Sequence, residues 1–394
     1  MILIPDSGML AKKTLVLIPR YCYEGLNGNR KAAASEKMGL NIRHQLEETE
    51  RKLLSPHACL SARSKGRLHA AQDSCELRTV FQRDRDRIIH SKTFRRLKHK
   101  TQVFLAPAGD HYRTRLTHVL EVSQIARTMA VCLRLNEYLT EAIALAHDLG
   151  HTPFGHAGEF TLNELHPGGF KHNVQSLRVV DVLENDRRGL NLTWEVRNGI
   201  IKHSKGYGAI LPGDRAQLAD TLEGQVVRVA DIMAYVNHDM DDALRAGMIR
   251  ESDLPADIRR VVGDDTSSRI DAMVKDLVEE TLRCDDGNLH LSGLMEETIS
   301  KLRMFLYDHV YRNYRVHNEF VKAQKIIREL YHFFLEHDFP RGGTCFCEAR
   351  EFEPRDDIGE RVHREVCDFI AGMTDRYALD LYNHIFMPKP WSVF

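Results

Sequence analysis

The stretch AIALAHDLGHTPFGHAGE (142–159) begins as an apolar run and ends among polar side chains of the kinds that bind metals. Its first half has helical composition, and Gly150 and Pro153 predict that the helix stops there and the chain turns. Five ionisable side chains surround this break: His147, Asp148, His151, His156 and Glu159. Burying so many such groups is costly unless they bind a metal or one another. The stretch therefore predicts a metal site on a helical scaffold.

Helical periodicity continues on both sides of this stretch. In RLTHVLEVSQIARTMAVCLRL (115–135), apolar residues recur at spacings of three and four, which marks one buried helix face. Similar patterns cover nine further segments: 41–54, 81–98, 137–148, 172–185, 217–242, 257–283, 289–312, 316–337 and 358–383. Alternating, strand-like runs are few and short. The sequence therefore predicts an all-α fold, a helical bundle with additional helices toward the C-terminus.

Composition places the chain in an ordinary class. It has 394 residues, 43% of them hydrophobic, and a formal net charge of −1, so no global basic field indicates a nucleic-acid partner. Its 8 cysteines are scattered, which favours reduced thiols over a disulfide framework. No apolar run reaches the roughly 20 residues of a membrane span. These features predict a cytoplasmic protein without a membrane partner.

The N-terminal residues 1–37 differ from the rest of the chain. They are mildly apolar but interrupted by charges and prolines, which makes a poor signal peptide. Met38 opens a more typical helical sequence, so this segment is either an extension upstream of the true start or an arm used in oligomer contacts. We expect three parts: this extension, a catalytic core over 38–250, and a C-terminal helical extension over 251–394 packed on the core.

Four side chains along the chain suit one metal ion. His118, the adjacent pair His147 and Asp148, and Asp231 each lie within or at the end of a helical segment. Imidazole nitrogens and carboxylate oxygens suit Mn, Fe, Ni, Zn or, less well, Mg. Ligands on separate helices can converge in the core of a bundle and leave coordination positions open for water and phosphate.

These motifs resemble a known family. The order H…HD…D is the signature of the HD superfamily, and HDLGHTPFGHAGE (147–159) resembles the motif of deoxynucleoside triphosphate (dNTP) triphosphohydrolases, both bacterial dGTPases and the animal sterile-alpha-motif/HD enzyme. Four other segments are similar to the bacterial members: RTVFQRDRDRIIHS (78–91), SKTFRRLKHKTQVF (91–104), RTRLTH (113–118) and ADIMAYVNHDMDDALRAG (230–247). The resemblance runs from about Met38 to Gly247 and is weaker beyond.

The resemblance implies an activity and a site. The chain would split a dNTP into deoxynucleoside and triphosphate, using a divalent metal held by His118, His147, Asp148 and Asp231. The resemblance also gives roles to eight further residues: His156 with Glu159 at the scissile bond, His151 and His172 near the α-phosphate, Arg115 on phosphate, and Tyr235, Asp239 and Gln102 at the sugar. Which histidine donates the proton stays open. The plainer interpretation of Tyr235 is core packing. The plainer interpretation of His172 is a residue at the N-terminus of a helix.

One position departs from the animal enzyme. Ile232 follows Asp231 where that enzyme carries a lysine for the triphosphate, so Lys202, His203 or Lys205 would have to supply the charge. Solvated basic side chains are the plainer interpretation of these three. The neighbouring Asp241 and Asp242 are expected to form an exposed acidic helix end rather than a second metal site.

Two alternatives compete with this interpretation. The nearer one is another HD phosphohydrolase, such as a cyclic-nucleotide phosphodiesterase or an alarmone hydrolase, although the latter carries a Glu-Asp pair where this chain has Leu149, Gly150 and His151. The other is a nucleotide sensor or single-stranded nucleic-acid binder, which the basic segment 83–100 favours. Proteins that resemble this chain form homo-oligomers, often hexamers or tetramers, and some bind a dNTP activator.

Overall fold

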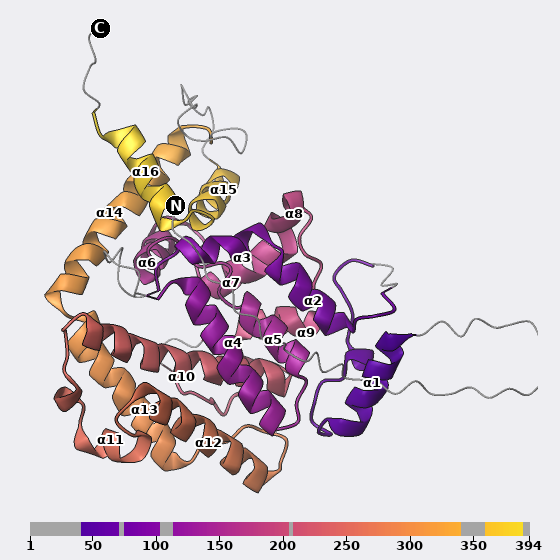
Figure 1. Ribbon diagram of the computed structural model, residues 1–394. Helices are drawn as coiled ribbons and strands as arrows, with labels where there is room; N and C mark the ends of the chain where they lie inside the picture. Colours follow the sequence, from indigo (N-terminus) through magenta and orange to yellow (C-terminus); the bar gives the residue numbers. More distant parts are fainter. Residues whose placement is uncertain (1–40, 71–74, 103–112, 205–207, 340–358, 389–394) are drawn as a thin grey trace, which may run out of the picture. The chain divides into compact units, whose positions relative to one another are not determined.

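The computed structural model describes residues 41–70, 75–102, 113–204, 208–339 and 359–388, and these are mainly helical (Figure 1). Within these ranges no strand forms, and isolated bridges pair Arg67 with Thr193 and Thr101 with Thr114. The prediction of an all-α fold is confirmed. Residues 1–37, expected to be an extension, lie outside the described residues.

The α-helices follow one another along the described chain. Their bounds are α1 Ile42–Leu53, α2 Val80–Ile89, α3 Lys92–Arg96, α4 Arg115–Cys132, α5 Glu137–Ala146, α6 His156–Leu165, α7 His172–Arg178, α8 Glu184–Arg187, α9 Trp194–Lys202, α10 Leu222–Arg245, α11 Ala256–Val262, α12 Thr266–Cys284, α13 Gly293–Leu306, α14 Tyr314–Glu336, α15 Glu360–Ala371 and α16 Asp375–Phe386. None of these helices is long and apolar enough to cross a membrane.

The three helices that carry the expected metal ligands begin at capping residues. Thr114 accepts a hydrogen bond from the backbone N–H of Thr117 at the start of α4, and Asn136 and Thr221 do the same at the starts of α5 and α10. Such caps stabilise a helix by about 1 kcal/mol each because they satisfy backbone donors that have no partner inside the helix. The local sequence therefore sets where each ligand-bearing helix begins.

A first hydrophobic cluster holds these helices together. It contains buried residues from Val80 to Val310, and α4 packs against both α5 and α10 within it. Figure 1 shows α4, α5 and α10 near one another in the middle of the helical layers. Their facing sides carry apolar residues and, among them, the buried histidines, so packing of this cluster brings the ligand-bearing faces together. The expected boundary at residue 250 stays a prediction.

A second hydrophobic cluster joins the C-terminal helices to a central segment. It consists of Phe154, Phe170, two residues of α6 and buried residues of α14, α15, α16 and the corner between α15 and α16. The helix α14 packs against α6 and then against α15 and α16. Because Phe154 lies within the stretch that carries the expected active-site histidines, this second cluster contacts the site directly.

Three segments expected to be continuous helices are interrupted. Segment 81–98 breaks because the Ser91 side chain caps a new helix, accepting from the Phe94 N–H. Segment 257–283 breaks at Gly263, whose φ of +87° lies in the left-handed region that glycine tolerates. Segment 358–383 breaks after Ala371, where a new helix, α16, is capped by Thr374. Periodicity alone did not reveal these caps.

The acidic pair near the end of α10 was expected to be exposed, and that expectation is wrong. Asp242 is buried and Asp241 is half-buried, and both form ion pairs with Arg113 at 3.1 and 3.2 Å. Asp241 also contacts Arg269 at 3.5 Å. The helix continues to Arg245, so these carboxylates face neighbouring segments instead of solvent.

Candidate metal centre and active site

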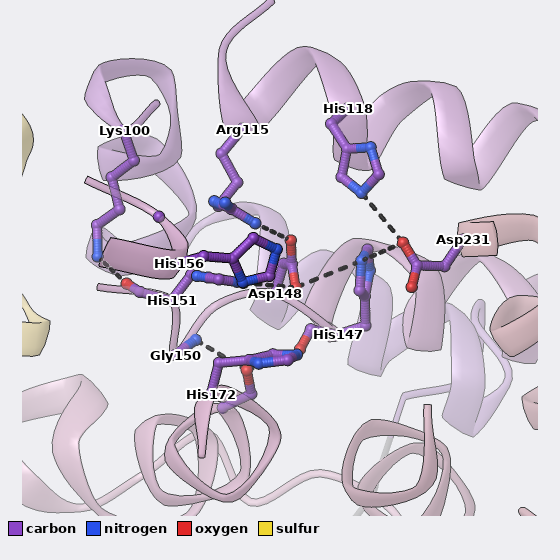
Figure 2. Close-up of polar contacts among 12 residues, drawn as sticks. Lys100, Arg115, His118, His147, Asp148, Gly150, His151, His156, His172 and Asp231 are labelled. Carbon is purple, nitrogen blue, oxygen red and sulfur yellow. Dashed lines mark hydrogen bonds and ion pairs between the residues drawn. The ribbon is translucent and has the colours of Figure 1, made fainter. Parts of the chain in front are cut away.

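The four expected metal ligands come together from three helices (Figure 2). His118 lies on α4, His147 and Asp148 follow the last turn of α5, and Asp231 lies on α10. Asp231 Oδ1 lies 3.2 Å from His118 Nε2 and 3.8 Å from His147 Nε2, and Asp148 Oδ1 lies 3.6 Å from His147 Nε2. The potential ligand atoms of His118, His147 and Asp148 all lie within 4.8 Å of one another. This arrangement brings two nitrogens and two oxygens into the same part of the core.

The state of His147 fits a metal ligand. Its Nδ1 lies 2.6 Å from the carbonyl oxygen of Ala144, and because a carbonyl only accepts, Nδ1 carries the proton. Nε2 then presents a lone pair to the site, and this buried atom has no hydrogen-bond partner among the described residues. Burial lowers the pKa of His147, which keeps the ring neutral. A backbone carbonyl that sets the imidazole tautomer in this way is typical of metal-binding histidines. The donor set therefore fits a divalent ion.

Asp148 is oriented by Arg115. Arg115 Nη1 lies 2.5 Å from Asp148 Oδ2, and both side chains are buried. The other oxygen, Oδ1, faces the imidazoles, at 4.0 Å from His151 Nε2 and 3.9 Å from His203 Nε2. Burial would raise the pKa of Asp148, but the charge of the Arg115 guanidinium helps to hold it well below its ordinary value. Arg115 was expected to bind phosphate; it reaches the site, and that role stays a prediction.

The helix α7 docks on the break after the His-Asp pair. Ser176 accepts a hydrogen bond from the Gly150 N–H at 2.8 Å and donates one to the His147 carbonyl at 2.7 Å. A Cβ at position 150 would lie 2.1 Å from the backbone nitrogen of Ser176, so only glycine allows this approach. Because α7 begins at His172, this contact sets where that histidine lies.

The four residues expected to be catalytic are brought together. The rings of His151 and His172 stack, with centroids 4.4 Å apart. Glu159 Oε1 lies 2.8 Å from His172 Nδ1, and Glu159 Oε2 lies 3.5 Å from His156 Nδ1. The side chain of His156 is 79% exposed, whereas His151 is buried. Glu159 therefore contacts two histidines, His172, whose side chain is 14% exposed, and the accessible His156.

The hydrogen bonds around His172 define its protonation. His203 Nδ1 lies 2.7 Å from the Ile200 carbonyl and must donate, and burial lowers the pKa of His203 to about 3, so its Nε2 is an acceptor. His172 Nε2, 3.1 Å from that acceptor, must therefore donate. Its Nδ1 faces the carboxylate of Glu159, whose pKa is far below its ordinary value despite burial, because His172 and His156 stabilise the charge. Both ring nitrogens of His172 thus carry protons.

The direction of the His172 pKa agrees with this assignment. Burial alone would lower it, but the charge of Glu159 and the hydrogen bond to it outweigh burial and raise the pKa. A buried imidazolium next to the cluster offers positive charge and a proton in the place where a phosphate would be processed. The plainer interpretation of His172, a helix N-terminal residue, accounts for its position but not for these contacts.

The three residues expected at the sugar differ in how far their side chains are buried and in their hydrogen bonds. Asp239 lies two turns after Asp231 on α10, accepts a hydrogen bond from the Tyr311 hydroxyl, and has a pKa that burial raises to about 7. Asp239 Oδ1 and Gln102 Oε1 are buried and find no hydrogen-bond partner among the described residues. Tyr235 is half-buried, packs against the first cluster and is hydrogen-bonded to Arg303. Their roles toward a sugar stay predictions.

Several residues near the site were not recognised as neighbours of the metal ligands. His203 was considered only as a charge for the triphosphate, yet its buried ring lies 4.9 Å from that of His147. Lys202 instead donates to the Ala216 carbonyl, and Lys205 lies outside the described residues. Tyr311 and Lys100 carried no local signal, because a tyrosine far along the chain and one lysine in a basic run look ordinary.

Lys100 is fully enclosed beside the catalytic stretch. Its Nζ donates to the carbonyl oxygens of His151 at 2.5 Å and Ala371 at 2.8 Å, as Figure 2 shows for His151. Burial lowers the pKa of Lys100 to about 7. Within the basic segment 83–100, this lysine therefore has an internal role that the charge pattern did not distinguish from those of its exposed neighbours.

Comparison with known proteins agrees with this geometry. Residues 115–235 match the HD domain, and residues 289–384 match the phosphohydrolase-associated domain. A deoxyguanosinetriphosphate triphosphohydrolase-like protein of Desulfatibacillum aliphaticivorans is 51% identical over 356 residues, covering 89% of this chain and 99% of that protein. One of the same name from Caldanaerobacter subterraneus subsp. tengcongensis is 50% identical over 352 residues, covering 89% and 98%.

A solved structure also aligns with the chain. It is that of a hypothetical protein from Aquifex aeolicus, with a TM-score of 0.46 and 18% identity, covering 78% of this chain and 68% of that one, and it carries no argument about function. The sequence relatives, by contrast, match over nearly their whole length. The chain therefore belongs to the family of deoxyguanosinetriphosphate triphosphohydrolase-like proteins and is an HD-domain phosphohydrolase.

Proposed function

We propose that this protein is a metal-dependent dNTP triphosphohydrolase, in which water attacks the α-phosphate and releases a deoxynucleoside and triphosphate. The observation that carries the proposal is the convergence of His118, His147, Asp148 and Asp231, with His147 Nε2 directed to the site without a partner among the described residues. The names of the relatives support a dNTP as the substrate class. The adjacent imidazolium supports attack on a phosphate.

The four ligands would hold a divalent ion, such as Mn, Mg, Fe, Ni or Zn, which acidifies a water and neutralises charge on the phosphate. Arg115 holds Asp148 so that one carboxylate oxygen faces the imidazoles, and the guanidinium remains next to the position of the phosphate. His172, charged and stacked on His151, attracts the α-phosphate. These groups act by placing positive charge where negative charge develops.

Departure of the nucleoside 5′-oxygen requires a proton, because an alkoxide is a poor leaving group. Glu159 stabilises the protonated form of His172 and lies 3.5 Å from Nδ1 of His156. We assign the donor to His156, which is accessible and paired with Glu159, and phosphate binding to His172, which is enclosed. The carboxylate of Asp239 would accept the hydrogen of the 3′-hydroxyl, Gln102 would contact the same hydroxyl, and the Tyr235 ring beneath the ribose would exclude a 2′-hydroxyl.

Replacing Glu159 with glutamine should shift the pH dependence of hydrolysis. Loss of the carboxylate charge removes what raises the pKa of His172 against burial, so a smaller fraction of this imidazole is protonated and able to attract the phosphate at a given pH. The alkaline limb of the kcat/KM profile should move to lower pH by about one unit or more, given the 1–3 units that a close opposite charge contributes. The profile is measured at saturating metal.

Glu164→Gln is the matched control, because Glu164 lies on the same helix, is exposed, and pairs with Arg328 at 2.9 Å. It should leave the profile unchanged. An unmoved alkaline limb in Glu159→Gln would contradict the role given to this carboxylate. If His156→Gln kept the wild-type kcat and His172→Gln lost it, the two histidine roles would be reversed.

The reaction itself is tested by chromatography of products formed with Mn²⁺ and each dNTP, singly and in mixtures. We expect triphosphate and deoxynucleoside, no products after chelation with EDTA, and faster turnover of dNTPs than of the matching ribonucleotides. Activity only in mixtures would reveal an activator nucleotide. Turnover of cyclic nucleotides or an alarmone but no dNTP would overturn the substrate assignment, and the absence of any turnover would favour the sensor alternative.

The alternative of nucleic-acid binding rests on the basic segment 83–100, but two of its arginines make contacts within the protein. Arg85 pairs with Asp86 and Glu141, and Arg87 donates to the carbonyls of Leu190 and Asn191. We therefore do not propose this function. The resemblance further implies a cytoplasmic homo-oligomer, a hexamer or tetramer, whose mass light scattering of the purified protein would report.

A further inference from the structure

The loop between His151 and His156 lies between the two hydrophobic clusters. Leu149, just before it, belongs to the first cluster, and Phe154, within it, belongs to the second. Phe154 and Gly155 have φ values of +61° and +55°, a region that a residue with a side chain rarely adopts. A backbone of this kind persists only when surrounding contacts hold it. The histidines at its two ends therefore depend on whatever holds Phe154.

Asp375 holds Phe154 and a second segment at the same time. This buried residue opens α16, and its Oδ1 accepts a hydrogen bond from the Phe154 N–H at 2.9 Å. Its Oδ2 accepts from the Thr101 N–H at 2.8 Å and from the Thr101 hydroxyl. Both carboxylate oxygens are thus used, and each faces donors belonging to a different segment.

Thr101 connects Asp375 to the other wall of the site. Its carbonyl oxygen accepts from Arg115 Nη2 at 3.3 Å, and Gln102 follows it directly. Arg115 in turn orients Asp148. A displacement of Thr101 would therefore reach the guanidinium that sets one of the expected metal ligands.

The corner that precedes Asp375 makes further contacts with the same segments. Lys100 bridges the carbonyls of His151 and Ala371, and Arg96 donates to the Gly372 carbonyl at 3.2 Å. The corner 371–375 thus contacts the segment 96–101 and the loop 151–154, both far from it in sequence, and the Lys100 and Asp375 side chains in these contacts are buried.

We propose that Asp375 is a positioning residue for hydrolysis, which keeps the His151–His156 loop and the Thr101–Gln102 segment in register across the site. Its carboxylate is needed because all its neighbours are donors: an amide would place its NH₂ group against the N–H of either Phe154 or Thr101. The inference rests on the proposed function only for the choice of substrate, since it concerns how this phosphohydrolase site is assembled.

The test compares Asp375→Asn with Asp380→Asn, an exposed residue of the same helix that lies 3.6 Å from Arg376. We expect Asp375→Asn to lower kcat by tenfold or more, because ångström-scale misplacement of reacting groups can cost about a hundredfold. Mn²⁺ affinity measured by calorimetry should change less than about threefold, since all four ligands lie on or next to α4, α5 and α10 rather than on the loop. Amide exchange over 149–158 should become faster, and Asp380→Asn should match the wild type.

A purely structural role predicts a different result. Asp375→Asn would then unfold at lower temperature but keep the wild-type kcat and the wild-type exchange in 149–158, and this would overturn the proposal. Thr101→Val removes only the hydroxyl donor, and it is the variant to test if Asp375→Asn does not fold. An unchanged kcat and unchanged amide exchange in Thr101→Val would also overturn the proposal. Wild-type protein without activity on any dNTP would refute the proposed function, whereas the exchange comparison would still decide the role of Asp375.

Discussion

Asp231→Asn is expected to remove metal binding and to reduce hydrolysis by more than a thousandfold with the fold intact. Asp231 Oδ1 is the atom that lies near both His118 Nε2 and His147 Nε2, at 3.2 and 3.8 Å, and the carboxylate is the anionic ligand contributed by α10. Changes in residues that merely orient a metal ligand cost roughly 10–100-fold, so the loss of a ligand should exceed that range. Asparagine keeps the size of the side chain and leaves the apolar packing of α10 unchanged.

Metal binding by this variant can be measured without turnover. A ligand that binds only the folded state stabilises it by about 2.7 kcal/mol at a hundred times its dissociation constant. The melting temperature of the wild type should therefore rise when Mn²⁺ is added after EDTA treatment, and that of Asp231→Asn should not. Asp220→Asn, an exposed residue just before α10, is the control and should respond like the wild type. A full Mn²⁺ shift in Asp231→Asn would refute the ligand assignment.

Gly150→Ala is expected to destabilise the protein strongly and abolish activity. The added Cβ would lie 2.1 Å from Ser176 N, 2.4 Å from the Gln175 carbonyl carbon and 2.6 Å from the His172 carbonyl oxygen. All three are backbone atoms of α7, so no side chain can rotate away. Overpacking typically costs about 1–3 kcal/mol, and a clash with a whole helix should reach or exceed the upper end.

The same substitution separates α7 from the metal ligands. If α7 shifts, the Ser176 hydroxyl can no longer bridge the Gly150 N–H and the His147 carbonyl, and His172 moves from its place against His151. Thermal unfolding measures the first effect and product formation the second. Gly213→Ala is the control, because nothing lies within 4 Å of a Cβ there. Equal melting temperatures for the two variants would show that α7 does not dock as described.

The local pattern of the sequence was sufficient for most of the helices and for the order of the ligands, but it identified no helical segment at α6 or α9. Apolar spacing of three and four identified the faces of α4 and α10, because a side chain's neighbours along a helix are fixed by its geometry. The HDLGHTPFGHAGE stretch contains five site residues within thirteen positions, and its break at Gly150 was visible from composition. The breaks at Ser91 and Ala371 were missed, because a cap within a continuing apolar pattern produces no change in periodicity.

Contacts between distant segments were decided only by the tertiary structure. His203 lies against His147, Tyr311 donates to Asp239, and Asp375 accepts from Phe154, although each pair is separated by more than fifty residues. Sequence spacing carries no information about such pairs, because they form only when α9, the segment after α13 and the α15–α16 corner pack on the core. The sequence by itself thus determined which groups could bind a metal and in what order they occur along the chain. Packing of the two hydrophobic clusters decided which carboxylate, carbonyl or hydroxyl sets the orientation and charge of each of these groups.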